Sequence, residues 1–332
     1  MMNPNILSLP KSTAICTLFE GHYHYGVAVL TNSLYANGFR GDIYAGYRGA
    51  LPSWTDVATD NSMVLGKDGK TMAVADGINL HLVPVTTDYH LTNYKPDFMM
   101  RLWNGPAHWV DKLFYFDPDI VVSAPWKYFI TWTDYGVALC EDVNSPLPKN
   151  HPRRVAWRNY FSDRGIELHF KDPVYVNGGY IGIDRKNESF LQTWITIQEA
   201  MASVIGGLSR SALAGKALPE ESQGPFSAFG KTDQDALNAA IEAWNGEFSF
   251  VGQEGMSLRP GAALMPHALG QPKPWKWNPV AQAFSGRPPR TVDREYWKNA
   301  SGIITAHSNR EVKGKLIELK IASLIGRFYK RR

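Results

Sequence analysis

The sequence predicts an α/β protein built around a mainly parallel sheet that is flanked by helices. The first observation is the order of elements near the N-terminus, where apolar runs at 13–19 and 42–46 enclose a helical pattern at 25–35. Two strands joined through a helix run parallel, and the loops that follow them meet at one edge of the sheet. The second observation is a strong apolar run at 112–116 that is followed at once by carboxylates, at the edge where α/β folds place ligands.

The other elements follow from hydrophobic spacing and from turn residues. Short β-branched or aromatic runs predict strands, and apolar residues three or four positions apart predict helices. We expect further strands at 78–85, 135–140 and 175–183, and further helices at 95–109, 190–204 and from Thr232, which is a good N-cap ahead of Asp233 and Asp235.

Three segments are expected to be irregular. Residues 48–75 contain many Gly, Asp, Ser and Thr and predict loops with a hairpin, while 270–292 is interrupted by Pro and Trp. Residues 206–230 are rich in Gly, Ser, Ala and Pro and show no periodicity. Because so long an irregular stretch is usually functional or mobile, 206–230 is interpreted either as a lid over an acceptor site or as a disordered insertion.

The bulk composition narrows the class of protein. The 332 residues carry a formal net charge of +4 and no nucleic-acid motif, so we expect no nucleic-acid partner. Cys16 and Cys140 lie in apolar runs and are expected to be buried small hydrophobes in a reducing compartment. No run reaches the roughly 18 apolar residues of a membrane span, and the N-terminus lacks a signal-peptide pattern. These features predict a cytoplasmic protein, with contact to the inner face of the membrane as an option.

The strand at 112–116 ends in Asp117-Pro118-Asp119. Two carboxylates one residue apart at the end of a strand can both reach a hard divalent cation, which can then bridge a diphosphate. The same triplet is also a good turn, and a second such pair, Asp233 and Asp235, stands at a helix start. Taken alone, the pattern leaves a metal site and a simple turn equally open.

A second cluster of chemically useful residues lies near the C-terminus, in the run HALGQPKPW that begins at His267. A neutral imidazole can serve as a third metal ligand. Gly270 would let the backbone approach a phosphate closely, and Lys273 can neutralise a diphosphate. A lone histidine is more often structural, but the combined spacing favours a metal and diphosphate site.

These motifs resemble the D-x-D and H-x-x-G-x-x-K-P-W motifs of the retaining glycosyltransferases of family 8, which have the GT-A fold, a Rossmann-like mixed and mainly parallel sheet. Both motifs are present without gaps, in the family's order, within 13–275. Further matches are Arg101 ahead of the metal strand, Glu141-Asp142 after the next strand, Asn177-Gly178-Gly179, and the run DQDALN from Asp233 to Asn238. One departure is Glu20, because the family usually has Asp or Asn in that loop.

The resemblance implies a role for each matching residue. It implies that Asp117, Asp119 and His267 bind Mn²⁺ or Mg²⁺, that Leu18, Glu20, Pro118, Gly270 and Lys273 hold the nucleotide and diphosphate, that Arg101, Asn177 and Gly178 bind the donor sugar, and that Asp142, Asp233 and Gln234 act at the reaction centre around that sugar. Gln234 would lie under the anomeric carbon. Since an amide is a poor nucleophile, this favours same-face attack over double displacement, which needs a carboxylate.

The implied function is the retaining transfer of a hexose from UDP-glucose or UDP-galactose to a glycan or lipid-linked saccharide, with lipopolysaccharide as one example. The catalytic domain is expected at 1–292, with a nucleotide-binding part at about 1–125 and a sugar-binding part at about 126–292. The alternatives are a non-catalytic nucleotide-sugar-binding protein of the same fold, a nucleotidyltransferase and a self-glycosylating primer. The intact metal and lysine motifs argue against the first, and the loop 18–22 is not the glycine-rich phosphate loop of the second.

Residues 293–332 are expected to form a basic helical extension. Within 311–332, apolar residues recur at helical spacing between lysines and arginines; they are Ile317, Ile321, Leu324 and Phe328. Such a helix can lie on an anionic membrane, and it can equally pack on the core with a solvated face. The sequence leaves these two interpretations open.

Overall fold

The computed structural model describes residues 12–212, 217–224 and 226–328. Within these residues the strands form a nine-stranded sheet in the order β3-β4-β5-β2-β1-β6-β8-β7-β9. The strands are β1 (Thr13–Glu20), β2 (Gly41–Arg48), β3 (Thr59–Asp60), β4 (Lys70–Ala75), β5 (Ile78–Pro84), β6 (Lys112–Phe116), β7 (Val137–Cys140), β8 (Tyr180–Asp184) and β9 (Phe248–Val251).

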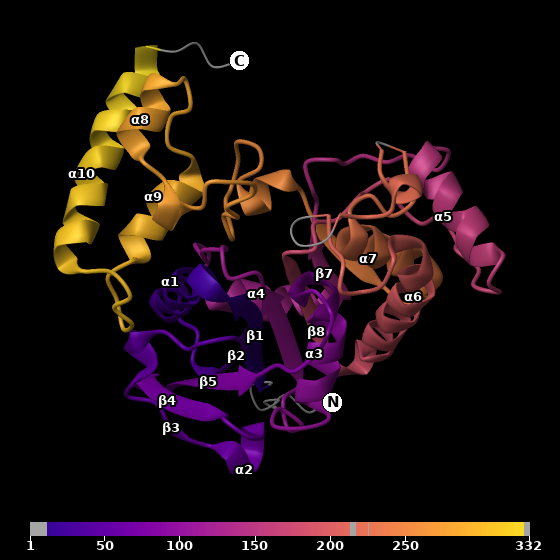
Figure 1. The fold of residues 1–332 in the computed structure, drawn as a ribbon, viewed down its shortest axis with the longest axis horizontal. Helices are drawn as coiled ribbons and strands as arrows, with labels where there is room; N and C mark the ends of the chain where they lie inside the picture. Colours follow the sequence, from indigo (N-terminus) through magenta and orange to yellow (C-terminus); the bar gives the residue numbers. More distant parts are fainter. Residues whose placement is uncertain (1–11, 213–216, 225, 329–332) are drawn as a thin grey trace, which may run out of the picture.

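The helices cover both faces of this sheet (Figure 1). They are α1 (His24–Ala36), α2 (Ser62–Leu65), α3 (Lys95–Trp103), α4 (Trp126–Trp132), α5 (Pro152–Ser162), α6 (Ser189–Ile205), α7 (Thr232–Ala243), α8 (Pro279–Phe284), α9 (Thr291–Asn299) and α10 (Asn309–Ile325). The expected unit of strand, helix and strand is confirmed as β1, α1 and β2.

The sheet is mixed and mainly parallel, as the sequence predicts. Strands β5, β2, β1 and β6 are parallel neighbours. Strand β8 runs antiparallel between β6 and β7, and β9 pairs in parallel with β7. The carboxyl ends of β1 and β6 therefore meet at one edge, where the loops after both strands can share a ligand.

The core divides into two layers because successive side chains of a strand point to opposite faces. In β6, Leu113 and Tyr115 pack towards α3, α6 and α7, whereas Phe114 and Phe116 pack towards α1 and α4. All four side chains are buried. Cys16 and Cys140 are also buried and unpaired, which confirms their expected role as small hydrophobes. This rigid strand presents the Asp117-Pro118-Asp119 loop at its end.

The C-terminal helices α8, α9 and α10 gather beside α1, across the view from α5, α6 and α7 (Figure 1). Tyr296 and Trp297 of α9 are buried in a cluster with Val29 of α1. The Asn32 side chain of α1 donates to the carbonyl oxygens of Asn299 and Ile304, each at 2.9 Å. Residue 293, the expected start of the extension, thus falls inside α9, and α9 packs against α1.

Helix α10 confirms the helical prediction for the tail as far as residue 325, and it has two different sides. Val312, Leu319 and Ala322 are buried against the neighbouring helices, whereas the side chain of Ile317 is 59% exposed and that of Leu324 57% exposed. Among the described residues, no helix is both long enough and apolar enough to cross a membrane.

Several predicted boundaries are wrong for identifiable reasons. The predicted strand 175–183 begins only at Tyr180, because Asn177, Gly178 and Gly179 form a turn that lines a cavity. The predicted helix 95–109 ends at Trp103, ahead of a turn through Gly105. Helices α4 and α5 were not predicted, because charged residues interrupt their short apolar patterns, and β9 was not predicted because it is only four residues long. Helix α8 lies within 270–292, which was expected to be irregular; it begins at Pro279, and proline is tolerated in the first turn of a helix.

Thr232 is the first residue of α7 and not its N-cap, which is Lys231. The Lys231 backbone N–H donates to Oδ2 of Asp235 at 2.7 Å, so a carboxylate inside the first turn reaches back to the helix start. The described part of 206–230 is irregular apart from a single 3-10 turn, Glu220–Ser222. Its suggested role as a lid stays a prediction.

Candidate functional site

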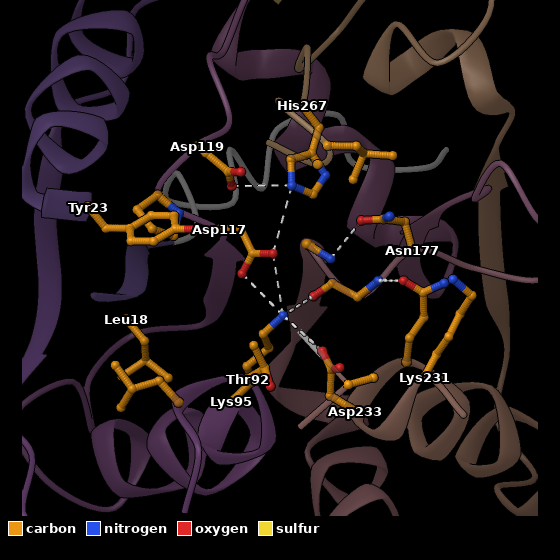
Figure 2. A pocket seen from close by; sticks show the side chains of 18 of the residues that line it. Leu18, Tyr23, Thr92, Lys95, Asp117, Asp119, Asn177, Lys231, Asp233 and His267 are labelled. Carbon is orange, nitrogen blue, oxygen red and sulfur yellow. Dashed lines mark hydrogen bonds and ion pairs between the residues drawn. The ribbon is translucent and has the colours of Figure 1, made fainter. Parts of the chain in front are cut away.

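A cavity of about 740 Å³ lies at the carboxyl ends of β1 and β6. Its walls come from the loops after these strands, from the turn before β8, from the start of α7 and from the segment after His267 (Figure 2). All predicted site residues except Arg101 line it, namely Leu18, Glu20, Asp117, Pro118, Asp119, Asp142, Asn177, Gly178, Asp233, Gln234, His267, Gly270 and Lys273.

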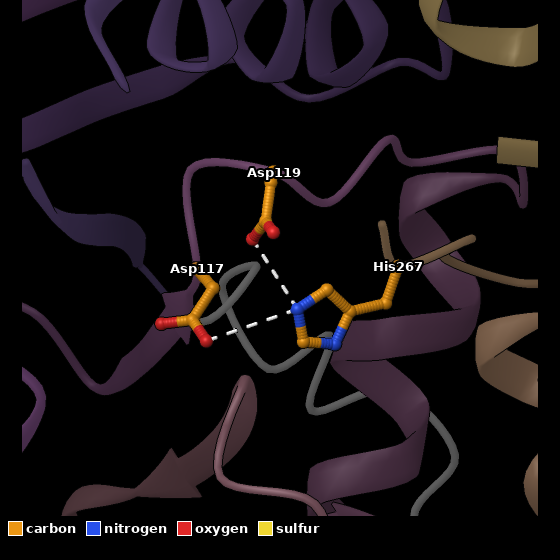
Figure 3. A group of neighbouring side chains, drawn as sticks. All are labelled: Asp117, Asp119 and His267. Atoms are coloured by element: carbon orange, nitrogen blue, oxygen red, sulfur yellow. Dashed lines mark ion pairs between the residues drawn. The ribbon is translucent and has the colours of Figure 1, made fainter. Parts of the chain in front are cut away.

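The two carboxylates of the Asp-Pro-Asp loop converge on the imidazole of His267 (Figure 3). Nε2 of His267 lies 3.2 Å from Oδ1 of Asp119 and 3.9 Å from Oδ2 of Asp117. The three ligand atoms, one from each residue, all lie within 4.8 Å of one another, which is close enough for them to bind one ion together. Three potential ligand atoms that face one another in this way can hold a single cation.

The backbone explains why residues 150 positions apart meet here. Ile120 and His267 form an antiparallel bridge, and the N–H of Ala268 donates to the Asp119 carbonyl oxygen at 3.1 Å. Gly179 leaves the space for the imidazole, because a Cβ at that position would lie 2.6 Å from Cε1 of His267. Gly270 has a φ of +72°, a conformation that residues with a side chain seldom adopt.

Each carboxylate of the triad uses its other oxygen to accept from a protein donor. The Tyr115 hydroxyl donates to Oδ1 of Asp117 at 2.8 Å, and the Lys273 ammonium donates to Oδ2 of Asp119 at 2.5 Å. Outer donors of this kind orient carboxylates that ligate a metal. The arrangement and the mixture of carboxylate and imidazole ligands therefore suit Mn²⁺ or Mg²⁺.

The charges around Asp119 favour its ionised form. Burial by itself raises the pKa of this carboxyl, but the neighbouring His267 and Lys273 lower the pKa by more than burial raises it. The net pKa of Asp119 therefore lies well below its usual range. Lys273 is likewise buried, which lowers its pKa, yet Asp119 more than compensates and the net pKa is raised. The site thus holds a fixed carboxylate beside a fixed ammonium.

The sequence analysis missed Lys95, the first residue of α3. Its side chain is 2% exposed, and Nζ lies 3.1 Å from Oδ1 of Asp117, 3.4 Å from Oδ2 of Asp233 and 2.7 Å from the Gly178 carbonyl oxygen. The two carboxylates outweigh the effect of burial and raise the pKa of this lysine, so it stays charged. The available signal was a lone lysine at the start of an amphipathic helix.

The prediction that Arg101 faces the donor sugar needs correction. Arg101 lies six residues further along α3, its side chain is exposed, and it donates to the Pro84 carbonyl oxygen at 3.2 Å. It does not line the cavity. The cationic side chain that enters from α3 is Lys95, because the first turn of the helix points at the end of β6 and its last turn points at β5.

A chain of polar contacts holds the turn before β8, which borders the triad at His267 (Figure 2). Nδ2 of Asn177 donates to Oδ2 of Asp142 at 2.7 Å, and Oδ1 of Asn177 accepts from the Gly179 N–H at 2.8 Å. The side-chain amide of Asn238 accepts from the Val176 N–H and donates to the Val176 carbonyl oxygen, and these two hydrogen bonds fix α7 against this turn. Gln234 is therefore held beside Gly178, whose N–H lies 3.4 Å from Oε1 of Gln234.

At the other end of the cavity, the loop after β1 offers aromatic and acidic groups. His22 stacks on Tyr23, with ring centroids 4.8 Å apart, and the Trp275 indole N–H donates to Nδ1 of His22 at 2.9 Å. Oε2 of Glu20 accepts from Nε of Arg48 at 2.9 Å, because the two residues are register partners on β1 and β2. His22, Tyr23 and Arg48 were not predicted.

Comparisons with known proteins bear on the fold. No protein-family model matches the chain, and no curated protein matches it in sequence. The apo structure of the WbbM bifunctional glycosyltransferase is similar, with a TM-score of 0.51 and 13% identity over 95% of this chain and 53% of that chain. This chain thus spans about half the length of that protein.

Two other solved structures have lower TM-scores and add no further weight. The glycosyltransferase GlyE of Streptococcus pneumoniae TIGR4 has a TM-score of 0.49 and 14% identity over 95% of this chain and 64% of that chain. The galactosyltransferase LgtC, solved with donor and acceptor sugar analogues, has a TM-score of 0.49 and 13% identity over 91% of this chain and 100% of that chain. The chain has a glycosyltransferase fold of the GT-A type.

Proposed function

We propose that this chain is a metal-dependent glycosyltransferase that moves a hexose from UDP-glucose or UDP-galactose to a saccharide acceptor with retention. The observation that carries the proposal is the convergence of Asp117, Asp119 and His267 in one cavity, with Lys273 beside them. The adjoining wall presents neutral and acidic hydrogen-bonding groups of the kind that bind sugar hydroxyls, among them Asp142 and Asn177. The GT-A fold supports this assignment but does not carry it alone.

In this proposal the triad holds Mn²⁺ or Mg²⁺, which supplies Lewis-acid stabilisation of the departing diphosphate. Lys273 adds a positive charge next to that leaving group, with Leu18, Glu20 and Pro118 around the nucleotide and Gly270 near the phosphates. Asp142, Asn177 and Gly178 hold the donor sugar, and Lys95 joins this set in place of Arg101.

The bond that breaks joins the anomeric carbon to the diphosphate, and the new bond joins that carbon to an acceptor oxygen. Gln234 lines the cavity, and in this proposal it lies under the anomeric carbon, where its amide would be a poor nucleophile. The nearby carboxylate of Asp233 is already engaged by Lys95 at 3.4 Å. We therefore favour attack by the acceptor on the same face as the leaving group, with Asp233 as the alternative nucleophile of a double displacement.

The test is UDP release from UDP-glucose and UDP-galactose by the full chain, with Mn²⁺ and with EDTA. Asp119→Asn should lower turnover by about two to three orders of magnitude, because one stabilising interaction of the transition state is lost. Asp163→Asn, an exposed position at the end of α5, is the matched control and should behave as the parent chain. Full activity in EDTA would refute the proposal, and UDP binding without turnover on any acceptor would favour a non-catalytic binding protein.

We also propose that α10 touches an anionic membrane, which would place a lipid-linked acceptor within reach and the protein on the inner face of the membrane. Ile317 and Leu324 remain more than half exposed although the helix packs on its neighbours, and Lys320 and Arg327 lie beside them. Flotation with phosphatidylglycerol vesicles tests this. The double variant Ile317→Glu with Leu324→Glu should float less than the parent chain, while Met63→Glu, at a position of α2 that is 98% exposed, should float as the parent chain does. Equal flotation of all three proteins would exclude the contact.

A further inference from the structure

The cations that line the cavity differ in how well they are neutralised. Lys95 lies within 3.4 Å of carboxylate oxygens of Asp117 and Asp233, and Lys273 contacts Asp119 at 2.5 Å. Both lysines therefore have carboxylate partners within the metal end of the cavity. They can hold a ligand's negative charge only in exchange for these partners.

Lys231 is the exception among the lining lysines. It is half-buried in the cavity wall, and within the part of the chain that the structure describes no carboxylate forms an ion pair with its ammonium group. Lys231 acts electrostatically on the carboxyl of Asp235 and lowers its pKa, but without an ion pair. The Asp235 oxygens are already used by the Tyr175 hydroxyl at 2.7 Å, the Lys231 backbone N–H at 2.7 Å and Arg153 at 3.4 Å.

The position of Lys231 relates it to the acceptor side. Lys231 directly precedes α7, and the N–H of Gln234 donates to its carbonyl oxygen at 2.9 Å, so the two residues lie one helical turn apart. Figure 2 shows Lys231 on the side of the cavity away from Leu18 and Tyr23. If the nucleotide occupies the Leu18 end, Lys231 lies beyond the anomeric carbon, where the acceptor must arrive.

We propose that Lys231 selects an acceptor sugar that carries an anionic group, a carboxylate or a phosphate, close to the attacking hydroxyl. This inference rests on the proposed function and deepens it by naming the acceptor class. An ammonium without a carboxylate partner in a half-buried wall gains a charge-assisted hydrogen bond when such a group binds. A bond of that kind corresponds to about a tenfold to hundredfold gain in affinity over a neutral sugar.

The experiment uses pairs of probes in which one member carries an anionic group and the other does not. Binding of methyl β-D-glucuronide and methyl β-D-glucoside to the full chain with UDP and Mn²⁺ is measured by ligand-observed NMR, and glucose 6-phosphate against glucose tests the phosphate source. The parent chain should prefer the anionic member by about tenfold or more. Lys231→Met should remove the preference, Lys231→Arg should keep most of it, and Lys149→Met, an exposed lysine outside the cavity, should leave it unchanged.

A preference that is absent from the parent chain, or that persists in Lys231→Met, overturns the proposal. UDP-glucuronate and UDP-glucose are compared in the same way. If Lys231→Met removes a preference between these donors and not between the acceptors, the anion belongs to the donor and the acceptor claim is wrong. UDP release is measured alongside: failure to transfer by a chain that binds the glucuronide through Lys231 contradicts the proposed function and leaves the binding claim standing.

Discussion

The ammonium of Lys95, the first residue of α3, lies 3.1 Å from Oδ1 of Asp117, the residue that directly follows β6. The same ammonium reaches Asp233 at the start of α7. One cation therefore ties the predicted metal loop to the predicted sugar-binding helix. A buried charge held in this way is costly to unpair.

Lys95→Met is expected to destabilise the protein by about 3–5 kcal/mol, because it leaves the carboxylates of Asp117 and Asp233 without their shared cation. Urea unfolding measures the loss. Mn²⁺ should raise the free energy of unfolding more in this variant than in the parent chain, since the bound metal would then compensate carboxylate charge that Lys95 no longer neutralises. Lys127→Met, at an exposed position of α4, is the control, and a Lys95→Met protein as stable as that control would contradict the expectation.

His267→Ala should weaken Mn²⁺ binding by at least about tenfold, since even the loss of an outer partner of a metal ligand costs that much. Isothermal titration calorimetry in the presence of UDP gives the affinity. His169→Ala serves as the control because His169 is exposed and does not line the cavity. Unchanged Mn²⁺ affinity in His267→Ala would remove His267 from the metal site.

Arg48→Met should weaken UDP binding by about tenfold, because the guanidinium holds Oε2 of Glu20 and so orients the other oxygen. If Glu20 accepts the imide N–H of uracil, the variant should lose affinity for UDP more than for CDP, which lacks that N–H. A merely structural role would lower both affinities equally. Arg48→Lys should restore part of the discrimination, and fluorescence-quenching titrations with both nucleotides decide between these outcomes.

Asp97, which lies outside the candidate site, should make the free energy of unfolding depend on pH. Burial, together with the charge of Glu199, raises the pKa of Asp97 from 3.8 to about 6 in the folded protein. A raised folded pKa means that the native state holds this proton more tightly, so the stabilising contribution is complete below the unfolded pKa and is lost as the pH rises through about 6.

Asp97→Asn should therefore match the parent chain near about pH 3.8 and become the more stable protein above about pH 6, by about 1–2 kcal/mol once solvent screening of this partly exposed group is considered. Urea unfolding across this range measures the difference. Glu199→Gln should produce a smaller change in the same direction. A difference between Asp97→Asn and the parent chain that does not vary with pH would show that charge at Asp97 is not its cause.

The sequence alone predicted those site residues that belong to short, local motifs. A strand that ends in two carboxylates can be recognised from seven or eight neighbouring residues, and the same holds for the spacing of His267, Gly270 and Lys273. The parallel order of β1, β2 and β6 follows from the helix between the first two strands and from the burial of all of them. These features and the resemblance predicted the fold, and thirteen of the fourteen predicted site residues line the cavity.

Lys95 and Arg101 mark the limit of that reasoning. Both are cations on α3, and the hydrophobic spacing of the helix assigns neither to the site, because it says which face is buried and not which end points at β6. Only the packing of α3 on the sheet places Lys95 beside Asp117 and turns Arg101 towards Pro84. The partners of Lys95 lie 22 and 138 residues away in sequence.

The sequence by itself determined the fold class, the carboxylate pair at the end of β6 and the set of motifs that resemble family 8. The tertiary structure decided which cations face which carboxylates: Lys95 and Lys273 pair inside the cavity, and Lys231 is left without a carboxylate partner among the described residues. The physical reason is range. Backbone geometry and hydrophobic spacing act between neighbours along the chain, whereas the energy of a buried charge depends on whichever distant groups packing brings within about 4 Å.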